Sequence, residues 1–292
     1  MLTPSPLGVV VPTRNSAATL ESTLLSLMSQ QRLGVEVVVV DSESTDETLG
    51  ICGRWGVRAL TSPPGNMYRA INVGMRALSA CDWLTYLNSD DFVYADGYAR
   101  LVEPGARLGL DVVYGNGDFT DQDGAFIFSQ TSFGPSIVCR QLAAGTMPFV
   151  QPAAVFRRDV FHQLHGFDER FTQIADYDFY ARAAAAGFRF GTARGRAVAA
   201  FRVHDRQLST VHKAIVDREK ALRRRECGRY RRFARMGWSA IWKVRNTANY
   251  LGWIAQRAES RSPKSTRGCQ RAASSATPDT GHRTPDDLEM SP

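Results

Sequence analysis

Short apolar runs alternate along residues 7–116 with segments whose apolar residues recur every three or four positions. Residues 7–12 (LGVVVP) and 35–41 (VEVVVVD) are valine-rich runs, typical of strands buried on both faces of a parallel sheet. Between them, residues 16–30 have the periodicity of an amphipathic helix, with Asn15 or Ser16 as a suitable N-cap. The same pattern predicts further strands at 57–60, 82–88 and 111–116 and helices at 44–54, 66–79 and 96–108. It favours an α/β fold, a doubly wound, mostly parallel sheet with right-handed crossovers.

The alternation stops after residue 116. Asp123-Gly124 lies between alternating segments within residues 117–130, which indicates a hairpin. We expect a strand at 151–157, helices at 158–165 and 175–186, and one or two strands within 188–203. In the helix at 96–108, Pro104 and Gly105 are expected to end or kink it.

The C-terminal part of the chain has a different character. Residues 212–256 have helical periodicity, with arginines on one face and aromatic and aliphatic residues on the other. Residues 258–292 are rich in Ser, Thr, Pro, Gly and Arg and hold too few large apolar residues to order themselves. We therefore predict an α/β domain at 1–210, a basic amphipathic helical extension at 211–257 and an unordered tail at 258–292.

Composition narrows the class of protein. Hydrophobic residues make up 43% and charged residues 22%, which is ordinary for a globular chain. Five scattered cysteines with no Cys-x-x-Cys pair argue against a disulfide framework or a zinc ribbon and favour a reducing compartment. We see no signal-peptide pattern and no apolar run of about 18 residues, so we expect a cytoplasmic protein without a membrane span.

The positive charge is concentrated at the C-terminus. The net charge is +7, but residues 1–210 hold 18 Lys and Arg against 21 Asp and Glu, whereas residues 211–292 hold 18 against 8. A basic amphipathic helix at 212–256 is typical of peripheral contact with a membrane, here the inner face of the cell membrane. The alternative is that its apolar face packs on the domain or on a second subunit. No nucleic-acid-binding motif accompanies the basic tail, so we expect no nucleic-acid partner.

Polar residues follow the predicted strands, where ligands bind in an open α/β sheet. Thr13 follows the first strand, Asp41 ends the second, and Asp90 and Asp91 follow the strand at 82–88. Asp41 alone is compatible with a turn or a helix cap. Two adjacent carboxylates at one sheet edge are either a solvated turn or a site for Mg²⁺ or Mn²⁺ completed by water and phosphate oxygens.

Five segments in order resemble glycosyltransferase family 2, whose members are inverting nucleotide-sugar glycosyltransferases with the GT-A fold. The resemblance spans roughly residues 7–210 and rests on these segments: VVVPTRNSAATLESTLLSLMSQ, VEVVVVDSESTDET, PGNMYRAINVGMRALSACDWLTYLNSDD, GFDERFTQIADYDFYARAAAAG and FRVHDRQLST. It implies a Rossmann-like, mixed but mostly parallel sheet flanked by helices, followed here by the helical extension.

The resemblance also implies roles for individual residues. Asp176 would be the catalytic base, although it also fits a helix N-terminal acid stabilised by the helix dipole. Asp91 and His204 would meet the metal and diphosphate, although His204 also fits a structural histidine. Asp178 is expected to hold its helix through Arg182, its i+4 neighbour. The implied donor-binding residues are Pro12, Thr13, Asn15, Asp41, Asn72 and Asp90.

The implied reaction moves a hexosyl or N-acetylhexosaminyl group from a nucleoside-diphosphate donor, by default UDP-linked, to an acceptor hydroxyl with inversion. Mn²⁺ or Mg²⁺ would assist, and the acceptor would be a glycan or a lipid-linked molecule in cell-surface polysaccharide or glycolipid synthesis. Ser89 stands where the motif carries a carboxylate, and Arg69 stands where relatives commonly carry Asp. These departures leave a catalytically inactive nucleotide-sugar-binding relative as the alternative.

Two other enzyme classes fit the sequence poorly. A sugar-nucleotide pyrophosphorylase needs a glycine-rich loop after the first strand, and PTRNSAAT has no glycine. A Rossmann dehydrogenase needs Gly-x-Gly-x-x-Gly after a strand, which is missing.

Overall fold

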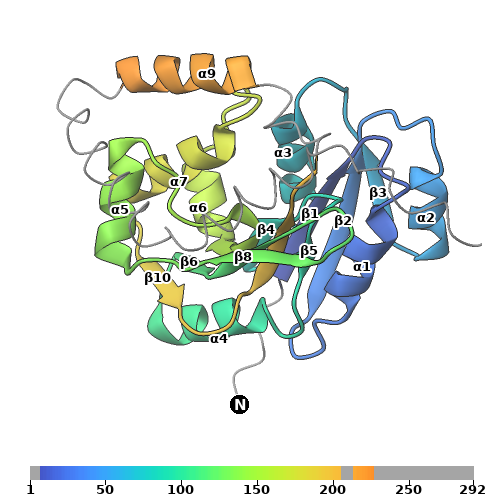
Figure 1. Ribbon diagram of the computed structural model, residues 1–292, viewed down its shortest axis with the longest axis horizontal. Helices are drawn as coiled ribbons and strands as arrows, with labels where there is room; N and C mark the ends of the chain where they lie inside the picture. Colours follow the sequence, from blue (N-terminus) through green and yellow to red (C-terminus); the bar gives the residue numbers. More distant parts are fainter. Residues whose placement is uncertain (1–6, 205–212, 227–292) are drawn as a thin grey trace, which may run out of the picture. The chain divides into compact units, whose positions relative to one another are not determined.

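The computed structural model describes residues 7–204 and 213–226, and their centre is a seven-stranded sheet (Figure 1). The strand order is β10-β6-β9-β4-β1-β2-β3. Its strands, in chain order, are β1 (Leu7–Thr13), β2 (Val35–Asp41), β3 (Arg58–Thr61), β4 (Trp83–Tyr86), β6 (Val112–Gly115), β9 (Ala154–Arg157) and β10 (Phe190–Ala193). β9 runs antiparallel to both its neighbours, whereas all the other neighbouring pairs are parallel. The expected mixed, mostly parallel sheet is confirmed.

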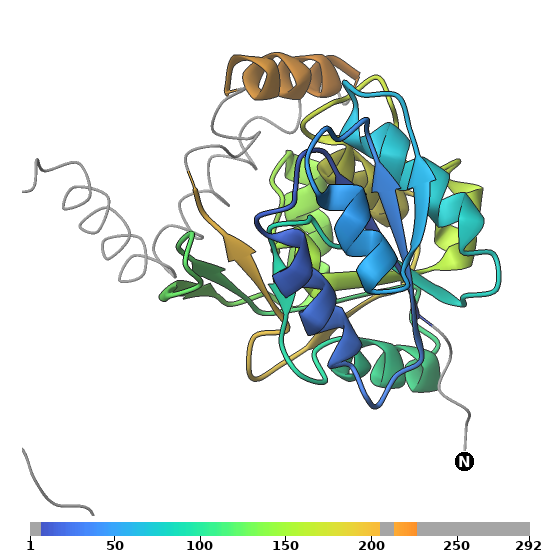
Figure 2. The same ribbon diagram turned by 90° about the vertical axis from the view of Figure 1, so that its right-hand side faces the viewer.

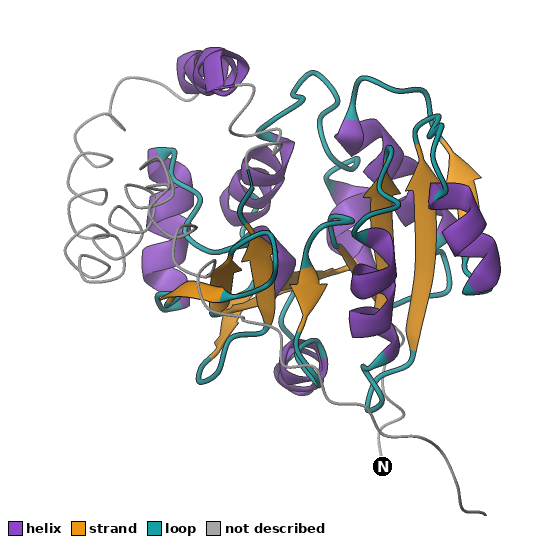
Figure 3. Ribbon diagram, turned by 45° about the vertical axis from the view of Figure 1, so that its right-hand side comes forward, coloured by secondary structure: helices purple, strands orange, loops and turns teal. Residues whose placement is uncertain are grey.

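Helices cover both faces of this sheet (Figure 3). One face packs against α1 (Leu20–Met28), α2 (Thr48–Arg54) and α4 (Ala99–Leu108). The other packs against α3 (Met67–Ala77), α5 (Pro135–Ala144), α6 (Arg158–Gln163) and α7 (Ala175–Ala185). β1 shows why both faces need a cover, because Val9 and Val11 join one core cluster and Val10 the other.

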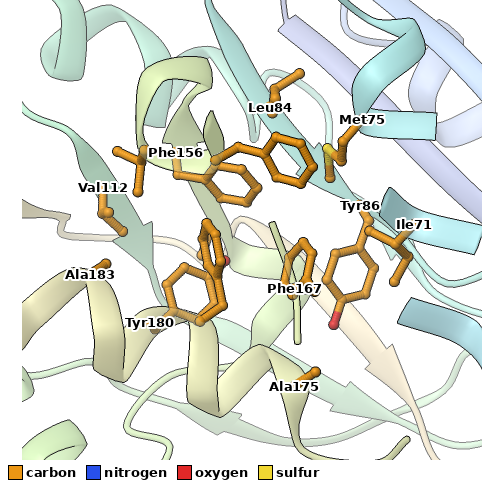
Figure 4. Packing of buried hydrophobic residues seen from close by; sticks show 14 of the residues in the cluster. Ile71, Met75, Leu84, Tyr86, Val112, Phe156, Phe167, Ala175, Tyr180 and Ala183 are labelled. Carbon is orange, nitrogen blue, oxygen red and sulfur yellow. The ribbon is translucent and has the colours of Figure 1, made fainter. Parts of the chain in front are cut away.

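The core beneath α3 and α7 is aromatic. Figure 4 shows Phe156, Phe167, Tyr86 and Tyr180 packed between the sheet and the helices. The Phe167 and Phe179 rings stack with their centroids 4.6 Å apart, and the Phe156 centroid lies 4.8 Å from that of Phe179. This packing fixes the helix that holds Asp176 against the sheet.

A second sheet of four strands, in the order β5-β11-β7-β8, lies beside the first (Figure 2). It comprises β5 (Phe92–Val93), β7 (Gly117–Thr120), β8 (Phe126–Gln130) and β11 (Ala199–Arg202). β7 and β8 form the hairpin expected around Asp123-Gly124. β11 runs parallel to β7 and antiparallel to β5, so the chain returns from residue 202 beside the loop that contains Asp90 and Asp91.

Several predicted boundaries are wrong, each for a local reason. α1 begins at Leu20 and α2 at Thr48, later than predicted, and neither helix has a side-chain cap. The polar residues before α1 instead bond to residues just before and at the start of α2: the Asn15 N–H donates to Ser44 and the Ser16 N–H to Thr48. Residues 151–153 form a 3-10 turn, η1 (Gln151–Ala153), before β9 begins.

The helix α4 does not end at Pro104 but continues to Leu108, where Gly109 closes it in the left-handed conformation. Gly105 serves close packing, since a Cβ there would lie 2.7 Å from the Trp83 ring. The prediction that these residues end the helix is therefore wrong, and the alternative, that they kink it, stays a prediction.

The helix α9 (Lys213–Glu226) belongs to the predicted extension and to the same compact unit as the two sheets. Its Val216 packs against the core cluster that contains α7. The predictions for residues 227–257 and for the tail at 258–292 lie outside the described residues. Within residues 7–204 and 213–226, no helix combines the length and apolar character that crossing a membrane requires.

Candidate functional site

The loops that follow β1 and β2 are joined by hydrogen bonds between their polar side chains. Thr13 ends β1 opposite Asp41 at the end of β2, and its hydroxyl donates to Asp41 Oδ1 over 3.0 Å. The Ser44 backbone N–H donates to Asp41 Oδ2 at 2.9 Å, and the Ser44 hydroxyl donates to Oδ1. Asp41 is 1% exposed, and its hydrogen bonds with Ser44 hold the turn that follows β2.

Asn15 lies in the loop after β1, exposed and in the left-handed conformation with φ of 52°. Its Oδ1 accepts the Thr45 N–H at 2.8 Å, and its own N–H donates to Ser44 Oγ at 2.8 Å. Pro12 is buried within β1, in register with Val40. Of the predicted donor-binding residues in this loop, Asn15 is the exposed one.

Ser89 connects the loop after β4 to the loop after β1. Its hydroxyl lies 2.8 Å from Ser16 Oγ, and its carbonyl accepts the Thr23 hydroxyl at 3.0 Å. Ser16 in turn donates its N–H to Thr48 Oγ1 at 2.8 Å. The residue that stands in place of a carboxylate is therefore a link between loops, and the three loops form one hydrogen-bonded edge.

Asp90 and Asp91 lie in different surroundings. Asp91 is 1% exposed, and its carboxylate accepts the Arg202 N–H at 2.9 Å and the Asn88 amide at 3.2 Å. Burial raises the pKa of Asp91 well above its ordinary value, and the charge of Asp90 adds to that shift. Asp90 is partly exposed, and its Oδ2 lies 2.8 Å from His204 Nε2. The structure thus brings His204 to Asp90, and its contacts favour Asp90 over Asp91 as the accessible carboxylate.

Asp176 is the second residue of α7 and is partly exposed. Its Oδ1 accepts the Tyr68 hydroxyl at 3.1 Å and the Tyr177 N–H at 2.7 Å. Both hydrogen bonds go to Oδ1, and Oδ2 has no partner within the described residues. Burial raises the pKa of Asp176, while these two hydrogen bonds and the positive charge of Lys220 oppose the rise. A carboxylate in this state is a suitable proton acceptor.

The position of Tyr68 places Asp176 at the same edge of the sheet as the strand-end residues. Tyr68 lies in the first turn of α3, and the Tyr68 and Tyr86 ring centroids are 6.4 Å apart, Tyr86 being the last residue of β4. The N-terminus of a crossover helix lies at the carboxyl edge of a parallel sheet. The resemblance also predicts that Asp41, Asp91 and Asp176 face one cleft, and this stays a prediction.

Asn72 and Arg69 have structural partners. Asn72 is 1% exposed; its amide donates to Phe167 O at 2.9 Å and to Glu169 Oε1 at 3.0 Å. Arg69 Nε lies 3.2 Å from Glu169 Oε2. Both residues therefore hold the segment that leads to α7, and the donor-binding role expected for Asn72 stays a prediction.

Asp178 is 3% exposed and anchors α7. Arg182 Nε lies 2.6 Å from Asp178 Oδ2, which confirms the predicted i+4 pair, and Arg182 also donates to Leu164 O and Gly166 O. From α9, Arg223 Nε lies 2.5 Å from Asp178 Oδ1. Sequence reasoning missed Tyr68, Glu169 and the contacts of α9, because their partners are more than 40 residues away in the chain.

Comparison with known proteins identifies the family. The family model for glycosyl transferase family 2 matches residues 8–164, more than half of the chain. The chain belongs to glycosyltransferase family 2. Its mixed sheet and flanking helices are the GT-A fold, as in the solved relatives.

The relatives are distant. A PGL/p-HBAD biosynthesis glycosyltransferase of Mycobacterium bovis is 32% identical over 187 residues, which is 60% of this chain and 68% of that protein. The succinoglycan biosynthesis protein ExoO of Rhizobium meliloti is 30% identical over 207 residues, 62% of this chain and 56% of that one.

The structure of S. aureus TarS residues 1–349 with UDP-GlcNAc matches with a TM-score of 0.56 and 20% identity, over 69% of this chain and 60% of that one. In a longer TarS structure the match covers only 39% of that chain. At this identity the likeness concerns the fold.

Proposed function

We propose that this family-2 member transfers a sugar from a nucleoside-diphosphate donor to an acceptor hydroxyl, with inversion at the anomeric carbon. The observation that carries the proposal is the state of Asp176. One of its carboxylate oxygens is fixed by Tyr68 and Tyr177, and the other has no partner within the described residues. Its pKa is raised by burial, as suits a general base.

In the proposed step, Asp176 Oδ2 accepts the proton of the acceptor hydroxyl while that oxygen forms a bond to the anomeric carbon. The bond from the anomeric carbon to the diphosphate oxygen breaks in the same displacement. A single displacement by one activated hydroxyl inverts the configuration. The Tyr68 hydroxyl and the Tyr177 N–H keep the carboxylate oriented, which contributes to the rate by positioning.

We propose that Asp90 and His204 hold the divalent cation, Mg²⁺ or Mn²⁺, in place of the Asp91 and His204 pair expected from the sequence. Such ions bind through one or two protein ligands and take their remaining oxygens from water and phosphate. The Asp90–His204 pair is partly exposed and fits this requirement, although the described residues contain no group of three or more ligating side chains. When bound, the cation offsets the negative charge that develops on the departing diphosphate. Asp91 would hold the loop after β4 in place through its hydrogen bonds with Asn88 and the Arg202 N–H.

Asn15, Thr13 and Asp41 form the edge on which we propose that the nucleoside binds. UDP is the proposed nucleotide of the donor because the TarS structures contain UDP-GlcNAc and UDP. The names of the mycobacterial and rhizobial relatives support a role in polysaccharide or glycolipid synthesis. We propose that a hexosyl or N-acetylhexosaminyl group is transferred to a glycan or a lipid-linked acceptor.

Peripheral contact with the cytoplasmic face of a membrane is part of the proposal. Ile215 and Leu222 are 40% and 45% exposed, and their spacing of seven residues puts them on one face of α9 with the exposed Arg218. Sedimentation with vesicles containing anionic lipid tests this contact. The unmodified protein should pellet with the vesicles, and Ile215→Ser/Leu222→Ser should remain in the supernatant. Equal sedimentation of the two would rule out this face.

The function is tested by a thermal-shift screen of nucleotide sugars with and without Mn²⁺. A ligand that binds only the folded state raises Tm, by an amount that depends on its concentration relative to Kd. We expect stabilisation by one nucleotide sugar, larger with Mn²⁺, followed by transfer or donor hydrolysis. Stabilisation without any turnover would indicate the inactive binding relative, and no stabilisation by any donor would refute the proposal.

A further inference from the structure

Glu219 of α9 ties that helix to the chain segment just before α7. Its side chain is buried, with 5% exposure. Glu219 Oε1 accepts the Thr172 N–H at 2.7 Å and the Thr172 hydroxyl at 2.9 Å, and Oε2 accepts the Gln173 N–H at 3.0 Å. One buried carboxylate therefore fixes two successive peptide units.

Those peptide units determine where Asp176 lies. Ile174 is the N-cap of α7, so Thr172 and Gln173 are the last residues before the helix, and Asp176 is two residues beyond its cap. The Gln173 carbonyl accepts a hydrogen bond from the Tyr68 hydroxyl at 3.4 Å, the same hydroxyl that donates to Asp176. A shift of residues 172–173 would move both Asp176 and the group that orients it.

A second connection from α9 lies one helical turn further on. Arg223 pairs with Asp178, which is 3% exposed and also holds Arg182. The helix α9 is thus attached to the chain on both sides of Asp176, by an acceptor at residue 219 and a cation at residue 223. The charge of Lys220, between them, lowers the pKa of Asp176.

We propose that Glu219 is a positioning residue for the transfer reaction, and that α9 is part of the active site rather than only a membrane-facing appendage. The inference rests on the proposed role of Asp176 as the base. Glu219 does not touch the reacting atoms; it holds the segment from which Asp176 projects. The reaction needs an oxygen of Asp176 within hydrogen-bond reach of the acceptor hydroxyl, and small misplacements of such a group are costly.

The test compares the full-length protein with Glu219→Gln and with Ala221→Gln, an exposed position on the same helix. An amide NH₂ at residue 219 would face the Gln173 N–H donor to donor, so the segment loses part of its support. We expect Glu219→Gln to lower kcat about 10- to 100-fold with the donor KM and the Kd for UDP unchanged. Hydrogen exchange of residues 171–177 should become faster. Ala221→Gln should match the unmodified protein in kcat, donor KM, Kd for UDP and hydrogen exchange.

The readouts separate two kinds of failure. If the unmodified protein transfers sugar and Glu219→Gln keeps its full kcat, or loses donor binding to the same extent as kcat, the positioning role is overturned. If the unmodified protein transfers no sugar from any donor, the proposed function fails instead, and the exchange rates still report whether Glu219 orders residues 171–177.

A milder variant covers the case in which Glu219→Gln does not fold. Thr172→Val deletes only the hydroxyl that donates to Glu219 and keeps the backbone N–H and the branched shape. It should lower kcat in the same direction but less, again with an unchanged donor KM. An unchanged kcat in Thr172→Val would then overturn the proposal.

Discussion

The two halves of the proposed site are built differently. One is the donor edge, the loops after β1, β2 and β4 that hold Asn15, Asp41 and Asp90; the other is the base helix, α7, which holds Asp176. At the donor edge, Asp41 bonds to Ser44 three residues later and to Thr13 on the neighbouring strand. Asn15, in the loop after β1, accepts the N–H of Thr45 in the loop after β2. Parallel pairing of β1 with β2 and β4 places these loops together before any side chain takes part. This half of the site follows from the sheet itself.

The base helix depends on distant partners. Asp176 bonds to Tyr68, 108 residues away, and the segment before α7 bonds to Glu219, about 46 residues away. Three separate segments must meet before Asp176 is oriented. We therefore expect remote substitutions to affect transfer through the base helix and to leave the donor edge unchanged.

The largest expected effect separates the two halves directly. Asp176→Asn should lower kcat by about 10²- to 10⁴-fold, because the acceptor hydroxyl loses its general base. Binding of UDP, measured by calorimetry, should be unchanged. The Tm at neutral pH should not fall: the pKa of Asp176 is raised on folding, so its ionised form weakens folding once the pH exceeds the ordinary value near 3.8. Normal turnover by this variant would refute the assigned mechanism.

The next comparison lies within the donor edge and distinguishes Asp90 from Asp91. Asp90→Asn should weaken Mn²⁺-dependent UDP binding by about 10- to 100-fold without lowering stability, by analogy with the loss of metal-site partners. Asp91→Ala removes the acceptor for the Arg202 N–H and should cost about 1–3 kcal/mol of unfolding free energy. Calorimetry and urea titration measure the two effects, and a reversal of the two results would restore Asp91 as the metal ligand.

A smaller effect reports on electrostatics at the base helix. The charge of Lys220 lowers the pKa of Asp176, opposing the rise from burial, and Tyr68 from α3 lowers it as well. Lys220→Met should therefore move the acid limb of the kcat–pH profile to higher pH, since Asp176 must be deprotonated to act. At pH values well above that limb, kcat should equal that of the unmodified protein. An acid limb that does not move would show that Lys220 does not act on the base.

The smallest effect is expected at Ser89. Ser89→Ala removes the hydroxyl contact with Ser16 and should cost about 0.5–1.5 kcal/mol of stability. If Ser89 only joins the loops, UDP binding with Mn²⁺ should stay nearly unchanged. A large loss of binding would instead give Ser89 a direct role toward the donor or metal.

The sequence determined the α/β alternation and the strand-end location of Thr13, Asp41, Asp90 and Asp91. Valine-rich runs are typical of strands in a parallel sheet that is covered on both faces. The carboxyl ends of such strands meet at one edge of the sheet, where ligands bind. The i+4 pair of Asp178 and Arg182 followed from helical spacing alone.

Only the tertiary structure decided which of these side chains are accessible and what holds them. Asp90 and Asp91 are neighbours in sequence, yet one is 1% exposed and the other pairs with His204 from the end of the second sheet. Ser89 and Arg69 stand where the family pattern carries carboxylates. In the structure, Ser89 bonds to Ser16 and Arg69 pairs with Glu169. Local periodicity reports which face of an element is apolar, but burial and pairing depend on segments that meet only when the chain has folded. Glu219 shows this best, because nothing in its helical neighbourhood points to the peptide groups that it binds.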